Sequence, residues 1–360
     1  MNMVSPVAVR EVIDCDLHIG LTDTDLLMPY LPDYWREQVV TRGIRGLSLA
    51  FTRPGAPGSV RPDWRPAAGI AGASLESVQA QALDPFDTRL AIANCLYGGQ
   101  ALLNADQGAA ICAATNDWIA AEWLDKDSRL RASIVVPWQL PELAVAEIER
   151  WAHDKRFVQV LILVSGDMPL GKRMMWPIYE AAEKYGLPLG FHAGTTYRHA
   201  PTGSGWPSYQ IEDEASFSQA FQQQLLSLLM EGVFAKFPRL KVVMLESGVT
   251  WLPFFFSRID KLWKGLRMET PWVDRLPSEI VRDQVRFTLQ PFDAPRDEDI
   301  THKIVDQIGS DRVLLFSTDY PHWHFDGTEA FPPGFDAALR RRMTVDNPLE
   351  TYTRLSEGLA

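Results

Sequence analysis

The sequence predicts a (β/α)8 barrel, and three observations lead to that prediction. Eight short aliphatic runs alternate with longer segments of helical periodicity between residues 11 and 317, which is typical of βα units that build a parallel sheet. The runs are almost continuously apolar, as expected when both faces of a parallel strand are covered. Eight such units in 360 residues favour a closed barrel over an open, doubly wound sheet, although periodicity alone does not determine closure.

The predicted strands and helices follow one another in regular order. The strands are expected at residues 11–17, 90–96, 131–137, 157–164, 187–192, 240–246, 285–290 and 313–317. Amphipathic spacing predicts helices at residues 106–125, 141–154, 176–185, 216–237, 251–264 and 297–308. We expect one domain that spans residues 1–360.

The segment 19–84 interrupts this alternation and is predicted to be an insertion after the first strand. It contains no clean βα unit, and residues 53–72 hold four prolines and four glycines. Such a composition indicates a long loop, and long loops in compact domains are usually functional or disordered. Trp35 and Trp64 provide apolar anchors, so we expect an ordered cap over the barrel mouth. A second irregular stretch, 193–213, is expected at the rim.

Composition excludes several classes of partner. The chain has 46 acidic and 35 basic residues and a net charge of −11, which argues against nucleic acid. It shows neither a secretory leader nor an apolar run long enough to span a bilayer, so no membrane partner is expected. Three cysteines indicate a reducing compartment rather than a disulfide framework, and we expect a cytoplasmic protein with a small-molecule substrate.

Ionisable side chains gather where the predicted strands end, the place where barrels of this type carry their catalytic residues. They are Asp14, Asp16 and His18 on strand one, His192 on strand five, Glu246 on strand six, and Asp319, His322 and His324 on strand eight. Asp16 and His18 are two residues apart and therefore share one face of their strand. A mixed set of histidines and carboxylates suits a divalent ion such as zinc or manganese.

Each of these residues also has a structural interpretation. His192 alone is more typical of a core histidine whose hydrogen bonds are satisfied, Glu246 could pair with an arginine, and Asp319 could cap a helix. Four strands that all end in potential ligands favour the metal site over these separate explanations.

The same residues resemble the amidohydrolase-related family of aminocarboxymuconate semialdehyde decarboxylase and the resorcylate-type decarboxylases. The resemblance rests on four motifs that occur in the family's order along essentially the whole chain: Ile13-Asp-Cys-Asp-Leu-His18, Phe191-His192, Glu246-Ser-Gly with Trp251-Leu-Pro and Arg258-Ile-Asp260, and Ser317-Thr-Asp-Tyr-Pro-His322. It implies a TIM barrel of the amidohydrolase superfamily with one divalent metal ion, zinc or manganese. It also implies a homo-oligomer, a dimer or a tetramer.

The resemblance further implies roles for individual residues. Its metal ligands would be Asp16, His18, His192 and Asp319, and Asp319 would also take part in proton transfer. Arg258 matches an arginine that in some members reaches a substrate carboxylate across a subunit interface, and an ion pair with Asp260 or a nearby acid is the alternative.

Glu246 departs from the family, because many of its decarboxylases have a histidine at the end of strand six. The spacing also leaves Ser247 as a possible equivalent. A glutamate can act as general acid or base if burial raises its pKa, so we expect Glu246 to be catalytic. The departure leaves the reaction and its substrate open.

Three functions are compatible with this site. The resemblance favours non-oxidative decarboxylation of an aromatic or unsaturated cyclic carboxylate, with Arg258, His322, Trp251 and Trp64 as substrate-binding residues, although aromatic residues at such spacings also serve packing. The first alternative is a hydrolase that uses a metal-activated water to cleave an amide, a lactone or a C–C bond. The second is a barrel that binds a ligand without catalysis.

Overall fold

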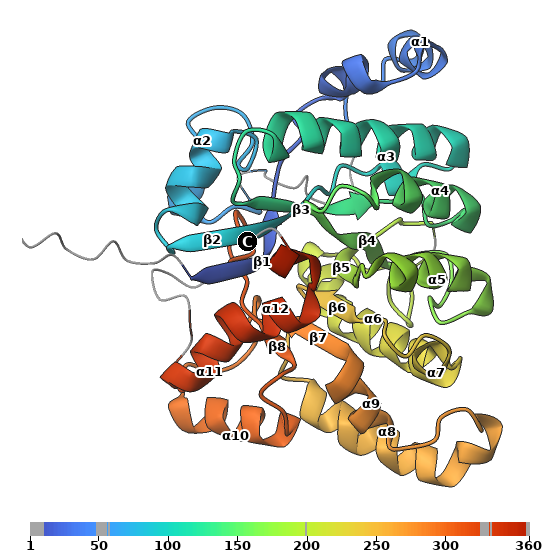
Figure 1. The fold of residues 1–360 in the computed structure, drawn as a ribbon, viewed down its shortest axis with the longest axis vertical. Helices are drawn as coiled ribbons and strands as arrows, with labels where there is room; N and C mark the ends of the chain where they lie inside the picture. The colour runs from blue at the N-terminus through green and yellow to red at the C-terminus, as the bar shows by residue number, and fades with distance from the viewer. Residues whose placement is uncertain are drawn as a thin grey trace, which may run out of the picture.

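The computed structural model describes residues 11–47, 56, 58–198, 200–324, 331 and 333–357. Eight parallel strands form one sheet in chain order (Figure 1). The strands are β1 (Val12–His18), β2 (Thr88–Asn94), β3 (Leu130–Val135), β4 (Phe157–Ser165), β5 (Leu189–Thr195), β6 (Val242–Leu245), β7 (Val285–Thr288) and β8 (Leu314–Leu315). Backbone hydrogen bonds from Cys15 N to Phe316 O (2.9 Å) and from His18 N to Tyr320 O (2.7 Å) join β1 to the residues after β8. The predicted (β/α)8 barrel is confirmed.

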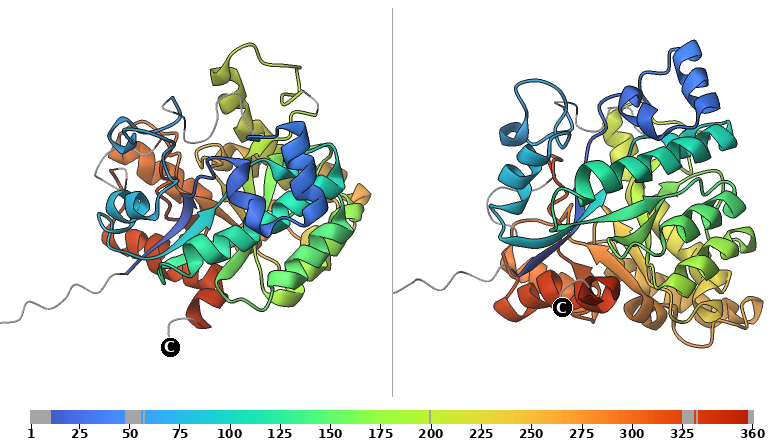
Figure 2. Two further views of the ribbon diagram at one scale, coloured as in Figure 1. Left: turned by 90° about the horizontal axis from the view of Figure 1, so that it is seen from above. Right: turned by 45° about the horizontal axis from the view of Figure 1, so that its top comes forward.

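Helices surround the strands, as the view from above shows (Figure 2). The longer ones are α1 (Asp33–Arg42), α3 (Ala105–Ile119), α4 (Pro141–Trp151), α5 (Trp176–Tyr185), α6 (Gln210–Met230), α8 (Leu252–Leu266), α9 (Pro277–Gln284) and α10 (Glu298–Ile308). The shorter ones are α2 (Leu75–Val78), α7 (Val233–Lys236), α11 (Ala337–Arg341), α12 (Asn347–Thr351) and α13 (Arg354–Glu357). None of the described helices combines the length and hydrophobicity needed to cross a bilayer.

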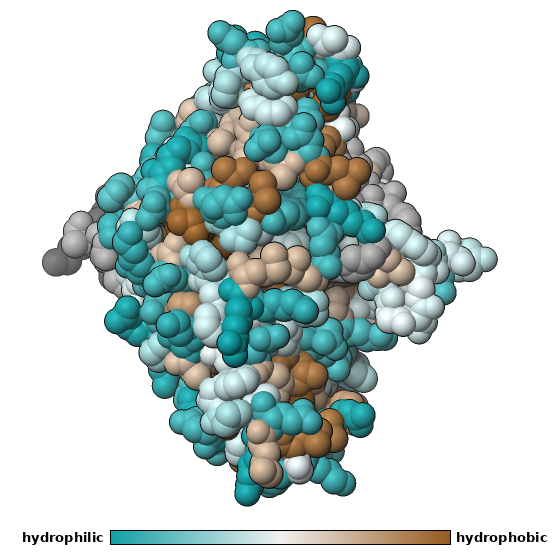
Figure 3. Space-filling model, turned by 90° about the vertical axis from the view of Figure 1, so that its right-hand side faces the viewer, coloured by the Kyte–Doolittle hydropathy of each residue, from teal (hydrophilic) through white to brown (hydrophobic). Residues whose placement is uncertain are grey.

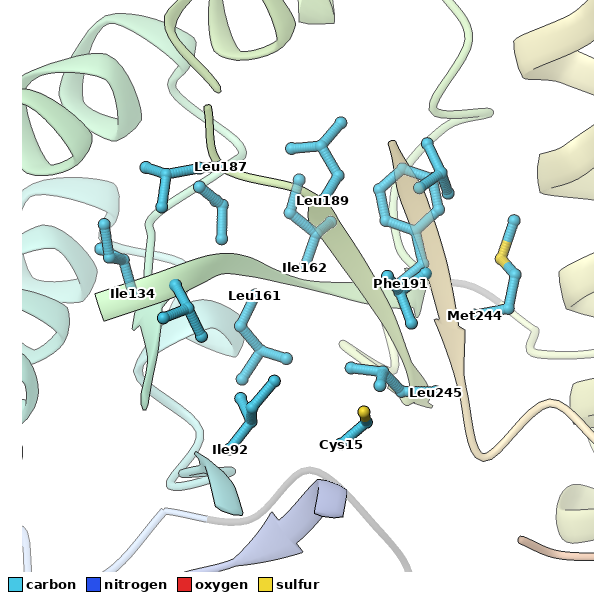
Figure 4. Packing of buried hydrophobic residues seen from close by; sticks show 14 of the residues in the cluster. Cys15, Ile92, Ile134, Leu161, Ile162, Leu187, Leu189, Phe191, Met244 and Leu245 are labelled. Carbon is cyan, nitrogen blue, oxygen red and sulfur yellow. The ribbon is translucent and has the colours of Figure 1, made fainter. Parts of the chain in front are cut away.

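The barrel wall buries its aliphatic residues almost completely. Figure 4 shows labelled side chains from successive strands packed side by side in this core. Ile92, Ile134, Ile162, Phe191 and Met244 from β2 to β6 have no more than 1% of their surface exposed. The apolar runs that predicted the strands therefore form the structure that supports the site.

The helix that follows β5 differs from its prediction at both ends. It was expected at residues 216–237, but α6 begins at Gln210, where the Glu212 carboxylate accepts a hydrogen bond from the backbone N–H of Tyr209 (2.8 Å). This stabilises an earlier start than the apolar periodicity indicates. The helix ends before Gly232, whose φ of +84° breaks it and separates α7. Helix α9 was not predicted.

The segment 19–84 is more helical than predicted. It contains a 3-10 helix of seven residues, Thr24–Tyr30, in addition to α1 and α2. Helix α1 buries only Val39, so its sequence carries no amphipathic pattern that could have revealed it. Residues 48–55 and 57 of this predicted insertion lie outside the described residues.

The described part of this segment is attached to the residues after β8. Val60 forms an antiparallel bridge with His322, and the backbone N–H of Arg61 donates to Pro321 O (3.1 Å). The ring of Trp64 lies 5.0 Å from that of Tyr320, centroid to centroid, and its side chain is buried. The insertion therefore contacts the strand-eight end of the candidate site directly.

Candidate metal centre

The carboxyl ends of β1, β5 and β6 and the segment after β8 bring the predicted site residues together. The group comprises Asp16, His18, His192, Glu246, Asp319, His322 and His324. All are buried or nearly so. Glu246 directly follows β6 and Asp319 lies four residues after β8, and both have left-handed backbone angles, with φ of +57° and +53°.

His18 is the centre of the cluster. Its Nε2 lies 3.1 Å from Asp319 Oδ1, 3.2 Å from Glu246 Oε1 and 3.6 Å from an oxygen of Asp16. One imidazole nitrogen thus faces carboxylates from three strand ends. A single proton on that nitrogen cannot satisfy all three, whereas a divalent cation among them can accept several ligands at once.

His192 has the hydrogen-bond pattern of a metal ligand. Its Nδ1 lies 2.7 Å from the carbonyl oxygen of Ala193, and because a carbonyl only accepts, Nδ1 carries the proton. The other nitrogen, Nε2, is buried without a hydrogen-bond partner among the described residues and lies 3.7 Å from Asp16 Oδ1. Oδ2 of Asp16 is likewise buried and unpartnered. A free imidazole lone pair beside a free carboxylate oxygen fits a bound divalent ion.

Two overlapping sets of four side chains have ligand atoms within 4.8 Å of one another. One contains Asp16, His18, His192 and Glu246, and the other contains His18, Glu246, Asp319 and His322. Glu246 belongs to both sets, although the ligand set that the resemblance implies omits it. The predicted ligand set of Asp16, His18, His192 and Asp319 spans the two groups and stays a prediction.

The electrostatics of the cluster favour positive charge. Burial and the neighbouring His322 oppose a proton on His18, but hydrogen bonds to Asp319 and Glu246 outweigh them and raise its pKa to about 9. Burial likewise opposes a proton on His322, yet Asp319 and Glu246 raise its pKa well above the usual range. Burial acts to raise the pKa of Asp319, but His322 and His18 hold it well below the usual range. The cluster therefore stabilises added positive charge, which a metal ion would supply.

A pocket of about 650 Å³ opens beside this cluster. Glu246 and His324 belong both to its lining and to the cluster, and Phe217 and Trp323 provide aromatic surface. Its other lining residues include Gly58, Ala193, Gln210, Ile211, Glu214, Ala215, Ser218, Ser247, Pro291 and Asp293. Among the described lining residues there is no lysine or arginine, so the walls themselves are acidic.

Of the predicted substrate-binding residues, the structure brings only His322 into the cluster. Trp64 packs on Tyr320, and Trp251 packs on Phe255 and Phe287 while its indole N–H donates to Ser247 O (2.9 Å). Neither tryptophan lines the 650 Å³ pocket. Their roles in substrate binding stay predictions.

Arg258 lies away from the cluster, on α8. It is exposed and lines a separate groove of about 440 Å³ between α6 and α8. The alternative ion pair of Arg258 with Asp260 or a nearby acid is not found among the described residues, and the Asp260 carboxylate accepts hydrogen bonds from the backbone N–H and the hydroxyl of Ser278 (3.0 and 2.7 Å). Within one chain, Arg258 is therefore not placed to meet a substrate.

Several residues around the site had no assigned role. Asp14 is fully buried and accepts hydrogen bonds from Thr318 Oγ1 (2.6 Å), Thr318 N (3.0 Å) and Asp16 N (3.1 Å); burial raises its pKa to about 7. It thereby joins β1 to the residue before Asp319. Its position two residues before Asp16 was the available signal. Glu214 was missed because it lies between the stretch 193–213, interpreted as irregular, and the helix predicted at 216–237, whereas α6 includes it.

Comparison with known proteins gives concordant matches. Residues 13–354 match the sequence profile of the amidohydrolase family. The gamma-resorcylate decarboxylase of Polaromonas sp. strain JS666 is 26% identical over 240 residues, which cover 63% of this chain and 71% of the relative. The gamma-resorcylate decarboxylase of Rhodococcus jostii strain RHA1 is 25% identical over 75% of this chain and 86% of its own length.

Solved structures share the fold. An amidohydrolase from Mycobacterium avium subsp. paratuberculosis superposes with a TM-score of 0.71 at 20% identity, over 95% of this chain and 99% of the other. Dihydroxybenzoic acid decarboxylase from Polaromonas sp. JS666, solved with manganese and the inhibitor 2-nitroresorcinol, gives 0.67 at 18% identity, over 97% and 99%. At these identities the structural matches establish a common barrel.

Proposed function

The chain belongs to the amidohydrolase family, and from this premise we propose that it is a metal-dependent enzyme that removes carbon dioxide from an aromatic carboxylate without oxidation. The curated relatives that match it over most of their length are gamma-resorcylate decarboxylases. The observation that carries the proposal is the free Nε2 of His192, buried beside Asp16 in a cluster that adjoins a 650 Å³ pocket.

The proposed cofactor is one divalent ion, manganese or zinc. Asp16, His18, His192 and Asp319 would hold it, and Glu246 is the alternative ligand. Related barrels solved with manganese support this choice. When bound, such an ion polarises substrate oxygens and holds a carboxylate and a neighbouring hydroxyl in place.

The expectation that burial raises the pKa of Glu246 is wrong: burial and Asp319 act in that direction, but His192, His322 and His18 lower the pKa below its usual value. Glu246 is therefore a carboxylate, and the proton that decarboxylation requires is assigned to His322, whose pKa is raised. The reaction breaks the bond between the ring carbon and the carboxyl carbon and places a proton on the ring carbon. Nδ1 of His322 lies 2.9 Å from Glu246 Oε1 and 2.8 Å from Asp319 Oδ1, so these carboxylates hold and orient the imidazole. Glu246 thus acts with a histidine from the segment after β8, although it replaces the histidine that many related decarboxylases have after strand six.

The pocket walls support a substrate with a ring and hydrogen-bond donors. Phe217 and Trp323 offer aromatic surface, while Glu214 and Asp293 offer carboxylate acceptors without a salt-bridge partner among the described residues. Phenolic hydroxyl groups fit such walls. The substrate carboxylate would face the metal ion, because the described pocket residues offer it no cationic side chain other than histidine.

We also propose that the chain forms a homo-oligomer through the outer face of α6 and α8. The 440 Å³ groove there contains Arg258 and the exposed apolar side chains of Leu262 and Leu266. Hydrophobic side chains gather at the lower end of the face seen in Figure 3, where α8 lies in Figure 1. Apolar surface of this kind is typical of protein contacts, and it would place Arg258 at a subunit interface.

Two further assignments accompany the proposal. The segment 19–84 is proposed to cap the site, which is supported by the bridge between Val60 and His322. A cytoplasmic location is proposed because Cys15, Cys95 and Cys112 are all buried free thiols.

Hydrolysis is the second candidate function, and the acidic pocket favours it. Carboxylates such as Glu246 and Asp319 can take a proton from water, and an uncharged amide or lactone would meet no repulsion from Glu214 and Asp293.

One assay separates the two functions. The manganese-loaded protein is incubated with hydroxybenzoates, gamma-resorcylate among them, and in parallel with amides and lactones. We expect carbon dioxide and the corresponding phenol from at least one hydroxybenzoate, and none from an Asp319→Asn variant. Turnover confined to the amides or lactones would replace decarboxylation by hydrolysis.

A further inference from the structure

A line of buried polar side chains leads from the candidate metal site into the barrel wall. Asp16 Oδ1 accepts a hydrogen bond from Asn94 Nδ2 (2.8 Å), and Asn94 Oδ1 accepts one from Ser133 Oγ (2.6 Å). Ser133 Oγ accepts from Gln159 Nε2 (2.8 Å), and Gln159 Oε1 accepts from the hydroxyl of Tyr352 (2.9 Å). All five side chains are fully buried.

These four hydrogen bonds run in one direction. Each intermediate residue accepts through an oxygen and donates through its N–H or O–H, so that every donor points toward Asp16. Hydrogen bonds arranged head to tail polarise one another, which makes the last donor, Asn94 Nδ2, stronger than an isolated amide. The four hydrogen bonds therefore act together on the carboxylate of Asp16.

The strands are built to hold this arrangement. Ser133 of β3 and Gln159 of β4 are direct partners in the sheet register. Gly190 of β5 leaves the space that the Gln159 amide occupies, because a Cβ at that position would lie 2.5 Å from the amide carbon. Polar side chains buried in a barrel wall cost stability unless all are bonded, and here each bond leads to a candidate ligand.

We propose that Asn94, Ser133, Gln159 and Tyr352 are positioning residues that hold Asp16 in the orientation needed to bind a divalent ion. The proposal rests on the proposed metal-dependent function. None of the four touches the reacting atoms. The four residues instead affect the affinity for the metal ion. The most distant of them, Tyr352, lies between α12 and α13 near the carboxyl-terminal end of the described chain.

The test is the Mn²⁺ dissociation constant of the metal-free protein, measured from the free-ion signal in electron paramagnetic resonance. An Asn94→Leu variant is expected to weaken Mn²⁺ binding by roughly 10- to 100-fold, the usual effect of losing a hydrogen bond to a metal ligand. Ser133→Ala is expected to have a smaller effect. Tyr352→Phe removes one oxygen atom and is expected to weaken binding by about 2- to 5-fold through loss of polarisation.

Tyr179→Phe is the matched control. Tyr179 is also fully buried, but its hydroxyl donates to the backbone carbonyl of Leu170 and has no link to Asp16. The Tyr179→Phe variant should lose about as much thermal stability as the Tyr352→Phe variant and keep the wild-type affinity for Mn²⁺. Folded Asn94, Ser133 and Tyr352 variants with the wild-type affinity would overturn this inference alone. A wild-type protein that binds no Mn²⁺ would overturn the proposed function and this inference together.

Discussion

Glu246 and Asp319 hold backbone conformations that side chains rarely adopt, and both belong to the candidate site. A left-handed conformation costs ~1–2 kcal/mol for a residue with a Cβ, and such strain tends to persist where function requires it. Here it turns two carboxylates from different strand ends toward the same nitrogen of His18, 3.2 and 3.1 Å away.

The two carboxylates should respond differently to neutralisation. Asp319→Asn is expected to lose most of the bound metal, because Asp319 is a predicted ligand. Glu246→Gln is expected to keep the metal and to lower kcat by roughly 10²- to 10⁴-fold with little change in KM, the usual cost of removing an acid–base group. Elemental analysis of both purified variants, together with steady-state kinetics, checks this. A metal-free Glu246→Gln protein would make Glu246 a ligand and contradict the assignment.

At the scale of elements, the inserted segment contacts the end of β1 through glycines. The backbone N–H of Gly20 donates to Gly72 O (2.8 Å). A Cβ on Gly72 would lie 2.8 Å from the carbonyl oxygen of His18, and its φ is +76°. No other residue type allows the insertion to approach this strand so closely.

Gly72→Ala is therefore expected to lower thermal stability more than Gly69→Ala. Both positions have left-handed angles and share a cost of ~1–2 kcal/mol, but Gly69 has open space around its Cβ position whereas Gly72 meets backbone. The Gly72 variant should also lose activity as His18 shifts, while the Gly69 variant keeps it. Equal melting temperatures and activities of the two variants would show that the contact with His18 is unimportant.

All eight strands could be predicted from the sequence, because parallel strands that are buried on both faces consist of almost continuous runs of apolar residues. It also placed Asp16, His18, His192 and Glu246 at strand ends, where the structure brings them together. It did not reveal α1, which lacks an amphipathic face, or the role of Asn94, whose partners Asp16 and Ser133 lie 78 and 39 residues away. Hydrogen bonds between residues far apart in the chain leave no local sequence pattern. The residues that support the candidate ligands could therefore be found only in the structure.

At the scale of the whole molecule, Arg354 ties the carboxyl-terminal segment to elements on the side of the barrel where β4 begins. Its buried guanidinium donates to the carbonyl oxygens of Phe157 (2.8 Å), Ala152 (2.9 Å) and Tyr185 (2.8 Å). These residues begin β4 and follow or end helices α4 and α5. Arg354 thus links the carboxyl-terminal segment to the end of the barrel opposite the site.

Arg354→Met is expected to lower the free energy of unfolding by at least ~3 kcal/mol, since hydrogen bonds from a charged donor contribute ~1.5–3 kcal/mol each. Arg312→Met, which removes an exposed ion pair with Glu350, should cost less than about 1 kcal/mol. Chemical denaturation of both variants measures the difference. If Arg354→Met unfolds at the same denaturant concentration as Arg312→Met, the carbonyl contacts are not stabilising.

The hydrogen bonds between β1 and the residues after β8 also bear on how the protein is made. His18 and Asp319 are 301 positions apart in the chain, so a ribosome must deliver nearly the whole polypeptide before these two side chains can meet. A nascent chain that ends at β8 lacks Asp319, His322 and His324. Contacts between such distant residues form late in folding, because a long loop must close first. The complete site, with Asp319 and His322 beside His18, therefore forms only after the residues that follow β8 have been made and have joined β1.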